Sequence, residues 1–390
     1  MKTAYILASY RTPGCRAKKG KFKDMRPDDL AAAAIAGLVE RTGIDPLQID
    51  DVLLGCAFPE GEQGMNMARI ASLKAGLPYQ VPAQTINRFC SSGLQAIALA
   101  AERIIAGFAD CIVAGGAESM TMVPMAGNKY SANPTLAAEW PETFASMGIT
   151  AELVADKYDI SRQAQDAFAV GSHAKAAAAI EAGRFNDEII PVEVELTRLD
   201  KNKVQKETEL VRIDDGVRAE TSQEGLAGLK PAFKMDGTVT AGTSSQMTDG
   251  AAASLVVSEE FLKKLGGEPL ARFVAFAARG VPPEIMGIGP VEAIPLALNL
   301  AGLKETDIGL IELNEAFAAQ ALAVIQELQL NPEIINVNGG AIALGHPLGC
   351  TGAKLTATLL HELQRREARY GMVSMCIGGG MGAAGIFEKL

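Results

Sequence analysis

The strongest constraint on the fold is an internal repeat, because both ends of the 390-residue chain follow one order of predicted elements. In each end a helix-like, alanine- and leucine-rich run passes a glycine, Gly43 or Gly302, and enters an apolar strand. Each end then continues through a second strand, a glycine-rich turn, a helix, and a strand that closes on a glycine cluster. Alternating strands and helices predict a mostly parallel sheet covered on both faces. Two copies predict a pseudo-twofold pair of sheets.

The middle of the chain breaks this pattern. It opens with a methionine-rich, loop-like stretch, followed by one predicted helix from Ser161 to Ala182 and a charged stretch from Arg184 to Glu220. We therefore expect an inserted domain between the two repeats. The predicted organisation is an N-terminal half over 1–118, completed by about 250–268, an insert over 119–249, and a C-terminal half over 269–390.

Composition limits the possible partners and compartments. A net charge of −10 opposes broad attraction to nucleic acid or to anionic membrane surfaces. Six cysteines without a Cys-x-x-Cys pair, beside only three histidines, suggest neither a disulfide framework nor a metal site. No apolar run is expected to approach a membrane span, and polar residues follow the N-terminus too soon for a signal peptide. We expect a cytoplasmic protein that binds neither nucleic acid nor membrane.

Cys90 is the first candidate for chemistry, because it lies where an apolar strand gives way to an apolar-faced helix. A thiol at the positive end of a helix is expected to have a lowered pKa. Neighbouring backbone N–H groups could bind an oxyanion. A lone cysteine is nevertheless more often a small buried hydrophobic residue, so its position leaves both interpretations open.

Two later segments add polar chemistry beside glycines. Gly339 to Gly352 places His346 in a glycine loop before a helix, where a catalytic or a structural role is possible. Another strand ends with Cys376 and runs into glycines, so free N–H groups follow a second thiol. The Gly-x-Gly-x-x-Gly from Gly380 to Gly385 is predicted to be a turn between strands, because only five residues follow it.

Four segments together resemble the thiolase family, and the resemblance covers essentially the whole chain. They are Asn87-Arg-Phe-Cys90-Ser-Ser-Gly, Asn314-Glu-Ala-Phe-Ala, Gly339-Gly-Ala-Ile-Ala-Leu-Gly-His346-Pro-Leu-Gly, and Cys376-Ile-Gly-Gly-Gly-Met-Gly. The resemblance implies an α/β fold of five layers, αβαβα. Two similar mixed-sheet halves would be related by pseudo-twofold symmetry, and an inserted loop domain would hold coenzyme A.

The resemblance also implies roles for five residues. Cys90 would accept the acyl group, His346 would be the base that activates it, and Cys376 would move a second proton. An enolate oxygen would be stabilised by His346 and by a water held by Asn314. The backbone N–H groups of Cys90 and Gly378 would bind the tetrahedral oxyanion.

Coenzyme A is expected as a co-substrate rather than as a permanently bound cofactor. The resemblance points to Arg218 beside its adenine and phosphate end and to Ser245 near its pantetheine. Met147, Met286 and Phe317 would line the acyl end. From the residues alone, Arg218 could equally be a solvated surface charge, Ser245 a turn residue, and the other three ordinary core.

The substrate is less strongly indicated than the chemistry. Ser146 precedes Met147 where short-chain biosynthetic thiolases tend to have histidine, so the chain looks more like a degradative 3-ketoacyl-CoA thiolase of fatty-acid oxidation. The alternatives are a biosynthetic acetyl-CoA acetyltransferase, a ketoacyl synthase, or a non-catalytic acyl-CoA binder. A ketoacyl synthase would have histidine in place of Cys376. By analogy with the family, we expect a homodimer or homotetramer.

Overall fold

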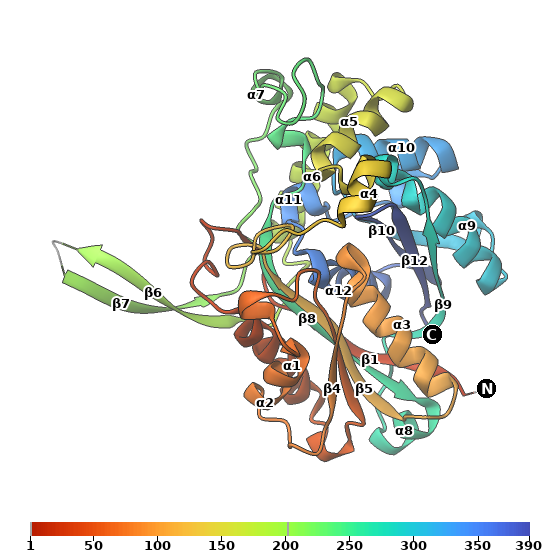
Figure 1. The fold of residues 1–390 in the computed structure, drawn as a ribbon. Helices are drawn as coiled ribbons and strands as arrows, with labels where there is room; N and C mark the ends of the chain where they lie inside the picture. Colours follow the sequence, from red (N-terminus) through yellow and green to blue (C-terminus); the bar gives the residue numbers. More distant parts are fainter. Residues whose placement is uncertain (1, 201–202) are drawn as a thin grey trace.

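The computed structural model describes residues 2–200 and 203–390 and contains two similar halves (Figure 1). The N-terminal half has strand order β4-β3-β5-β8-β1. Its strands are β1 (Ala4–Arg11), β3 (Asp51–Gly55), β4 (Ala83–Ile86), β5 (Cys111–Ser119) and β8 (Thr248–Ser258), and the short β2 (Cys15–Arg16) also pairs with β8. The C-terminal half has the order β10-β11-β12-β9. Its strands are β9 (Ala271–Gly280), β10 (Ile308–Leu313), β11 (Tyr370–Ile377) and β12 (Met381–Glu388).

The two halves repeat one pairing scheme. Strand β3 is parallel to β4 and β5, and β10 is parallel to β11 and to a single bridge at Ile335, which occupies the place of β4. Two antiparallel strands complete each half, β8 with β1 and β12 with β9. The halves join where β1 meets β9, at Tyr5–Arg272 and Ile6–Ala271. The predicted pseudo-twofold pair is therefore confirmed.

The sheets are mixed, so the mostly parallel sheet predicted from the residues alone is wrong. The reason is visible at the C-terminus, where β11 and β12 form a hairpin closed at Ile377 and Met381. Such a short connection can join only antiparallel strands, since a parallel pair needs a long crossover. Gly379 and Gly380 in this turn have φ of +79° and +83°, which favours glycine. The turn comprises residues 378–380, whereas the rest of the motif, Met381 to Gly385, lies in β12. The prediction that the motif lies at a hairpin between strands is confirmed, but the prediction that all of it is a turn is wrong.

Helices form three layers around the two sheets. On the outside of the N-terminal half lie α1 (Pro27–Thr42) and α2 (Met67–Lys74), and α8 (Glu259–Leu265) follows β8. On the outside of the C-terminal half lie α9 (Gly289–Ala301) and α10 (Ala318–Leu328). Between the sheets α3 (Ser92–Ile105) packs against α12 (Leu348–Arg365), and α12 contacts both β5 and β11 (Figure 1). The five-layered fold is confirmed.

The central layer shows why small residues follow the candidate site residues. A Cβ on Gly352 would lie 2.4 Å from the Leu94 nitrogen, and a Cβ on Gly93 would lie 2.7 Å from the Ala353 nitrogen. The two helices can therefore approach closely. The expected apolar face of α3 is buried, and its Ile97 belongs to the main core cluster. Truncating Ile97 to alanine would cost about 2–5 kcal/mol of stability.

The segment between the halves forms helices and one hairpin. The helices are α4 (Pro134–Glu139), α5 (Met147–Lys157), α6 (Arg162–Glu181) and α7 (Gln223–Ala227). The hairpin of β6 (Val192–Asp200) and β7 (Lys203–Val211) projects from the body of the molecule (Figure 1). The helix predicted from Ser161 is confirmed as α6, and the Ser161 side chain caps it by accepting from the Ala164 N–H. Helix α6 packs against α10 and the short α11 (Ala341–Leu344).

One apolar stretch, Pro283–Ala301, is long and apolar enough by composition to cross a membrane, so the expectation that no run approaches a span is wrong. However, 56% of the tested window is buried inside the protein. The stretch comprises a 3₁₀ helix, Pro283–Ile288, and α9, which packs on β9 and β12. Its apolar character is accounted for by this packing, as in the core helix of a globular domain.

Candidate active site

Cys90 lies in a tight turn, the 3₁₀ helix η3 (Phe89–Ser91), directly before α3. Phe89 has φ of +42°, which is unusual for a residue with a side chain. The Asn87 side chain accepts from the Phe89 N–H at 2.8 Å, and the Ser92 hydroxyl donates to the Phe89 carbonyl at 2.6 Å. These bonds hold the turn in a conformation that costs about 1–3 kcal/mol, and they fix the direction of the Cys90 thiol.

The environment of Cys90 keeps its thiol protonated. Burial raises the pKa of Cys90 to about 11, although hydrogen bonds from the backbone N–H groups of Gly378 and of Cys90 itself act to lower it. The predicted lowering of this pKa is therefore wrong, because the loss of solvation outweighs the helix end and the two N–H groups. Activation of the thiol near neutral pH requires a base. The same two N–H groups lie at the sulfur, where they can meet an oxyanion.

Cys376 lies at the end of β11 and is only 1% exposed. Burial, and then the nearby charge of Cys90, raise the pKa of the Cys376 thiol. The two sulfurs are thus close enough to interact electrostatically. Cys376 packs in one apolar cluster with Met286 and Phe317, and Met147 lines the edge of that cluster. The Met147 sulfur also lies 3.6 Å from the point where a Cβ on Gly378 would be.

His346 is buried, and both of its ring nitrogens have partners. Nδ1 lies 2.6 Å from the Thr351 hydroxyl, which itself donates to the Pro347 carbonyl at 3.0 Å. Nε2 lies 3.3 Å from Asn314 Nδ2, a group that can only donate. Both contacts require the hydrogen to be on Nδ1 and leave Nε2 as the acceptor. Burial and the positive charge of Lys354 lower the pKa of His346 to about 3, so the ring is a neutral base.

Asn314 follows β10 and is fully buried. Its backbone N–H donates to the carbonyl of Ser374, two residues before Cys376. Its side-chain Oδ1 has no hydrogen-bond partner among the described residues. Because buried polar atoms are nearly always paired, this acceptor fits a bound water or a substrate group. The amide therefore faces the His346 ring on one side and has a free acceptor on the other.

The two residues expected at the carrier differ in their surroundings. The Ser245 N–H donates to the Ala316 carbonyl at 2.9 Å, and the neighbouring Gln246 carbonyl accepts from the His346 N–H at 3.0 Å. Ser245 thus lies in a segment that joins the Asn314 and His346 loops. Arg218 is exposed, and its backbone N–H donates to Nδ1 of His173 on α6 at 3.1 Å. The side chain of Arg218 is free to meet a solvent-borne ligand.

The expected site residues form two linked groups. Cys90, Gly378 and Cys376 make one group, and Asn314 with His346 makes the other. The turn that contains Cys90 packs against both α12, which follows His346, and β11, which ends at Cys376. Sequence reasoning missed Thr351, which orients the His346 ring. A hydroxyl in the first turn of the helix after the histidine would have been the signal for it.

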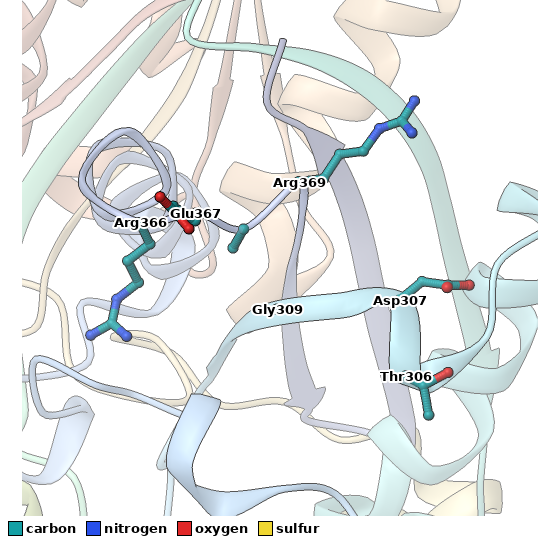
Figure 2. A pocket seen from close by; sticks show the side chains of 7 residues that line it. Thr306, Asp307, Gly309, Arg366, Glu367 and Arg369 are labelled. Carbon is teal, nitrogen blue, oxygen red and sulfur yellow. The ribbon is translucent and has the colours of Figure 1, made fainter.

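An open hollow of about 440 Å³ lies elsewhere, between the start of β10 and the end of α12 (Figure 2). It is lined by Thr306, Asp307, Gly309, Arg366, Glu367, Ala368 and Arg369. Two of its arginines already have carboxylate partners, Arg366 with Glu362 and Arg369 with Glu388. This hollow contains none of the expected site residues and has no nucleophile, so it is not a candidate active site.

The chemistry follows from what each group can do. A protonated thiol is held at two N–H groups, a neutral imidazole has Nε2 as its acceptor nitrogen, and a second protonated thiol lies near the first. The N–H groups suit an oxyanion, and the thiols suit covalent acyl transfer and proton donation. Fold and site together define the class, an α/β enzyme equipped for acyl transfer through a cysteine.

Comparisons with known proteins give the family. The thiolase N-terminal domain model matches residues 4–260 and the thiolase C-terminal domain model matches residues 267–389. The chain belongs to the thiolase family and is a thiolase enzyme, as the resemblance implied.

The chain is 57% identical to a 3-ketoacyl-CoA thiolase of Bacillus subtilis, over 100% of both chains. It is 47% identical to a human peroxisomal 3-ketoacyl-CoA thiolase, over 98% of this chain and 90% of that one. A crystal structure of the Bacillus anthracis acetyl-CoA acetyltransferase matches with a TM-score of 0.91 at 41% identity, covering 100% and 99% of the two chains.

Proposed function

We propose that this thiolase cleaves 3-ketoacyl-CoA with coenzyme A, giving acetyl-CoA and a shortened acyl-CoA, in the β-oxidation of fatty acids. The observation that carries the proposal is the protonated Cys90 thiol at the N–H groups of Cys90 and Gly378, with neutral His346 and Asn314 paired nearby. The names of the full-length relatives support the substrate class. Coenzyme A enters as a co-substrate.

The first half-reaction breaks the carbon–carbon bond. Cys90 gives its proton to Nε2 of His346 as the sulfur attacks the 3-keto carbon, and the resulting oxyanion is bound by the N–H groups of Cys90 and Gly378. The bond between C2 and C3 then breaks, and its electron pair becomes the enolate of acetyl-CoA. The enolate oxygen is stabilised by protonated His346 and a water on Asn314. Cys376 donates its proton to C2, and acetyl-CoA leaves.

The second half-reaction returns the enzyme to its starting state. Coenzyme A gives its thiol proton to the Cys376 thiolate and attacks the acyl group on Cys90. The departing Cys90 sulfur recovers its proton from His346. Every proton is therefore accounted for, and each residue ends as it began. The raised pKa of Cys376 supports its role as a proton donor near neutral pH.

The insert over 119–249 is proposed to hold coenzyme A, between an N-terminal half (1–118 with about 250–268) and a C-terminal half (269–390). Arg218 would contact the adenine and phosphate end, and Ser245, which precedes the β8 strand, would contact the pantetheine. Met147, Met286 and Phe317 would enclose the acyl end, and their shared apolar cluster with Cys376 supports this. Exposed Arg218 supports a charge contact with phosphate.

The strongest alternative is a biosynthetic acetyl-CoA acetyltransferase, which the named Bacillus anthracis structure favours. The test is a coenzyme-A-dependent cleavage assay over a series of 3-ketoacyl-CoA chain lengths, from acetoacetyl-CoA upward. We expect turnover to extend well beyond acetoacetyl-CoA. Activity confined to acetoacetyl-CoA would favour the biosynthetic enzyme. Preference for a substrate linked to a carrier protein would favour a ketoacyl synthase, and no turnover at any chain length would favour a non-catalytic binder.

The assembly and the compartment are also proposals. A homodimer or homotetramer is supported by β4, a partly exposed strand at one end of the sheet in the described residues. Exposed strand edges are natural places for pairing with a second chain. A cytoplasmic location is supported by the similarity to the bacterial Bacillus subtilis thiolase, whereas the human relative is a peroxisomal protein of a eukaryote. Light scattering on the purified protein would give its mass in solution.

A further inference from the structure

A buried carboxylate next to Asn314 collects hydrogen bonds from three segments of the chain. Glu315 is 2% exposed. Its Oε2 accepts from the Ser172 hydroxyl at 2.6 Å and from the Ile342 N–H at 3.2 Å, and its Oε1 accepts from Asn336 Nδ2 at 2.9 Å. Ser172 lies on α6, and Ile342 lies four residues before His346. Glu315 therefore joins the Asn314 segment to the histidine loop and to the insert.

Asn336 contacts the residues on both sides of Asn314. Its Oδ1 accepts from the Leu313 N–H at 2.9 Å, and its Nδ2 donates to the Leu313 carbonyl at 2.8 Å as well as to Glu315. Asn336 itself adopts φ of +45°, a conformation that asparagine tolerates better than most residues. The residues before and after Asn314 are thus tied to one side chain.

Two glycines let the histidine loop reach this carboxylate. A Cβ on Gly340 would lie 2.2 Å from the Glu315 carboxyl carbon. A Cβ on Gly339, whose φ is +80°, would lie 2.6 Å from the Ser172 carbonyl oxygen. The Gly340 N–H also donates to the Ser172 hydroxyl at 3.1 Å. Gly339 and Gly340 are therefore needed because the backbone lies directly against Glu315 and α6, and not only because glycines let the backbone come close to a substrate.

The Asn314 side chain depends on this arrangement for its position. Its Oδ1 has no partner among the described residues, and its Nδ2 meets only His346, at 3.3 Å. Without a strong bond of its own, the amide is placed by its backbone. We propose that Glu315, with Asn336 and Ser172, is a positioning residue that holds Asn314 against the His346 ring for stabilisation of the enolate. This inference rests on the roles proposed above for Asn314 and His346.

The proposal predicts a split between the two half-reactions. Carbon–carbon cleavage passes through an enolate and needs Asn314 beside His346, whereas exchange of an acyl group between acyl-CoA and labelled coenzyme A forms no enolate. Exchange uses Cys90, the Gly378 N–H, His346 and Cys376 but does not need Asn314. Glu315→Gln keeps the shape but turns an N–H₂ group toward either Asn336 or the Ser172 and Ile342 donors, so at least one donor loses its partner. We expect thiolysis to fall about a hundredfold, as for small displacements of positioned groups. Acyl exchange should change little.

Glu152 provides a matched control, because it has the same kind of surroundings without a link to Asn314. It is 1% exposed, accepts from the N–H groups of Thr238 and Val239, and lies 2.2 Å from the point where a Cβ on Gly237 would be. Glu152→Gln should lower thermal stability but leave the ratio of thiolysis to exchange at its wild-type value. Gly340→Ala and Gly237→Ala form a second pair that should differ in the same way.

The outcomes are separable. An equal fall in both reactions for Glu315→Gln, no fall in either, or the same split for Glu152→Gln would overturn the proposal. If Glu315→Gln does not fold, the milder Ser172→Ala must show the split. Asn314→Ala tests the underlying assignment, because it removes the amide itself. If Asn314→Ala shows no split, the proposed role of Asn314 fails, and if it alone shows one, the role of Glu315 fails.

Discussion

The beginnings of the two central helices occupy equivalent places in the repeat, yet they differ in chemistry. Helix α3 follows Cys90, a partly exposed thiol in a turn held by backbone and short side-chain bonds. Helix α12 follows His346, a buried ring with a partner at each nitrogen. In the proposed mechanism Cys90, as the nucleophile, must remain accessible to a substrate, whereas His346, as the base, must keep one tautomer and one orientation. The two copies of this structural unit therefore differ in how deeply the site side chain is buried, and this difference suits the two proposed roles.

The helix ends alone do not explain the reactivity. The pKa of Cys90 is raised to about 11 and the pKa of His346 is lowered to about 3, so both groups are neutral near pH 7. A resting thiolate–imidazolium pair is not favoured by these values. In the proposed mechanism, proton transfer to His346 must therefore accompany attack by the sulfur, when charge moves onto an oxygen that the N–H groups of Cys90 and Gly378 can bind.

The largest effects are expected from substitutions of the two site thiols, Cys90 in the N-terminal half and Cys376 in the C-terminal half. Cys90→Ala removes the atom that carries the acyl group, so thiolysis and acyl exchange should both fall by about a thousandfold or more. Cys376→Ser removes the proton donor, and thiolysis should fall by about a hundredfold or more, the usual contribution of a positioned acid. Acyl exchange should fall less than thiolysis in Cys376→Ser, because exchange uses Cys376 only to accept the coenzyme A proton and involves no protonation of an enolate. Labelled coenzyme A and purified variants suffice for both measurements.

Cys111→Ala is the matched control for this comparison, since Cys111 is a fully buried thiol on β5 that no proposed step uses. It should lower stability slightly and leave both rates nearly unchanged. Retention of acyl exchange by Cys90→Ala would contradict the assignment of the nucleophile to the N-terminal half. If Cys376→Ser lost acyl exchange and thiolysis equally, the proposed difference in role between Cys90 and Cys376 would be contradicted.

A smaller effect is expected from the support of the base. Thr351→Val removes the acceptor for the His346 Nδ1 hydrogen and leaves a buried donor unpaired, at a cost of about 1–3 kcal/mol. If most of that cost falls on the productive ring orientation, kcat should fall about tenfold or more. Because His346 serves both half-reactions, thiolysis and exchange should fall together, unlike in Glu315→Gln.

Thr356→Val is the control for Thr351→Val. Both threonines lie in α12, are fully buried, and donate to the carbonyl four residues earlier, Pro347 for Thr351 and Gly352 for Thr356. Only Thr351 also contacts His346. A rate loss of the same size in Thr356→Val would mean that the effect comes from α12 in general and would remove the specific role of Thr351.

Much of the fold could be predicted, because the repeat is recognisable from local sequence patterns. Glycine turns and apolar runs identified α3 and the strands around it. The sense of the strands was missed, since it depends on long-range pairing. In the site, motifs indicated the groups that the proposed mechanism uses. The supporting groups, Thr351 and Asn336, have no distinctive spacing and are recognisable only once distant segments meet.

The effect of pH on stability offers a subtler comparison between the two helix beginnings. The pKa of His346 is lowered from its usual 6.5 to about 3, so between these values the unfolded chain binds a proton that the folded chain does not. The stabilisation is present above pH 6.5 and is lost as pH falls, by up to about 1.4 kcal/mol per pH unit. The pKa of Cys90, at about 11, lies far outside this window.

Melting temperatures between pH 6.5 and 5 should therefore fall less steeply for His346→Asn than for the wild type, whereas Cys90→Ala should keep the wild-type slope. His173, whose pKa is lowered to about 4, should supply part of the slope that remains. The buried acids Glu118 and Glu315 have raised pKa values and act in the opposite direction, so only differences between variants are informative. If His346→Asn kept the full slope, the ring would already be charged in the folded protein. A charged ring could not accept the Cys90 proton. Another residue would then have to be the base, and the proposed division of nucleophile and base between the two halves would fail.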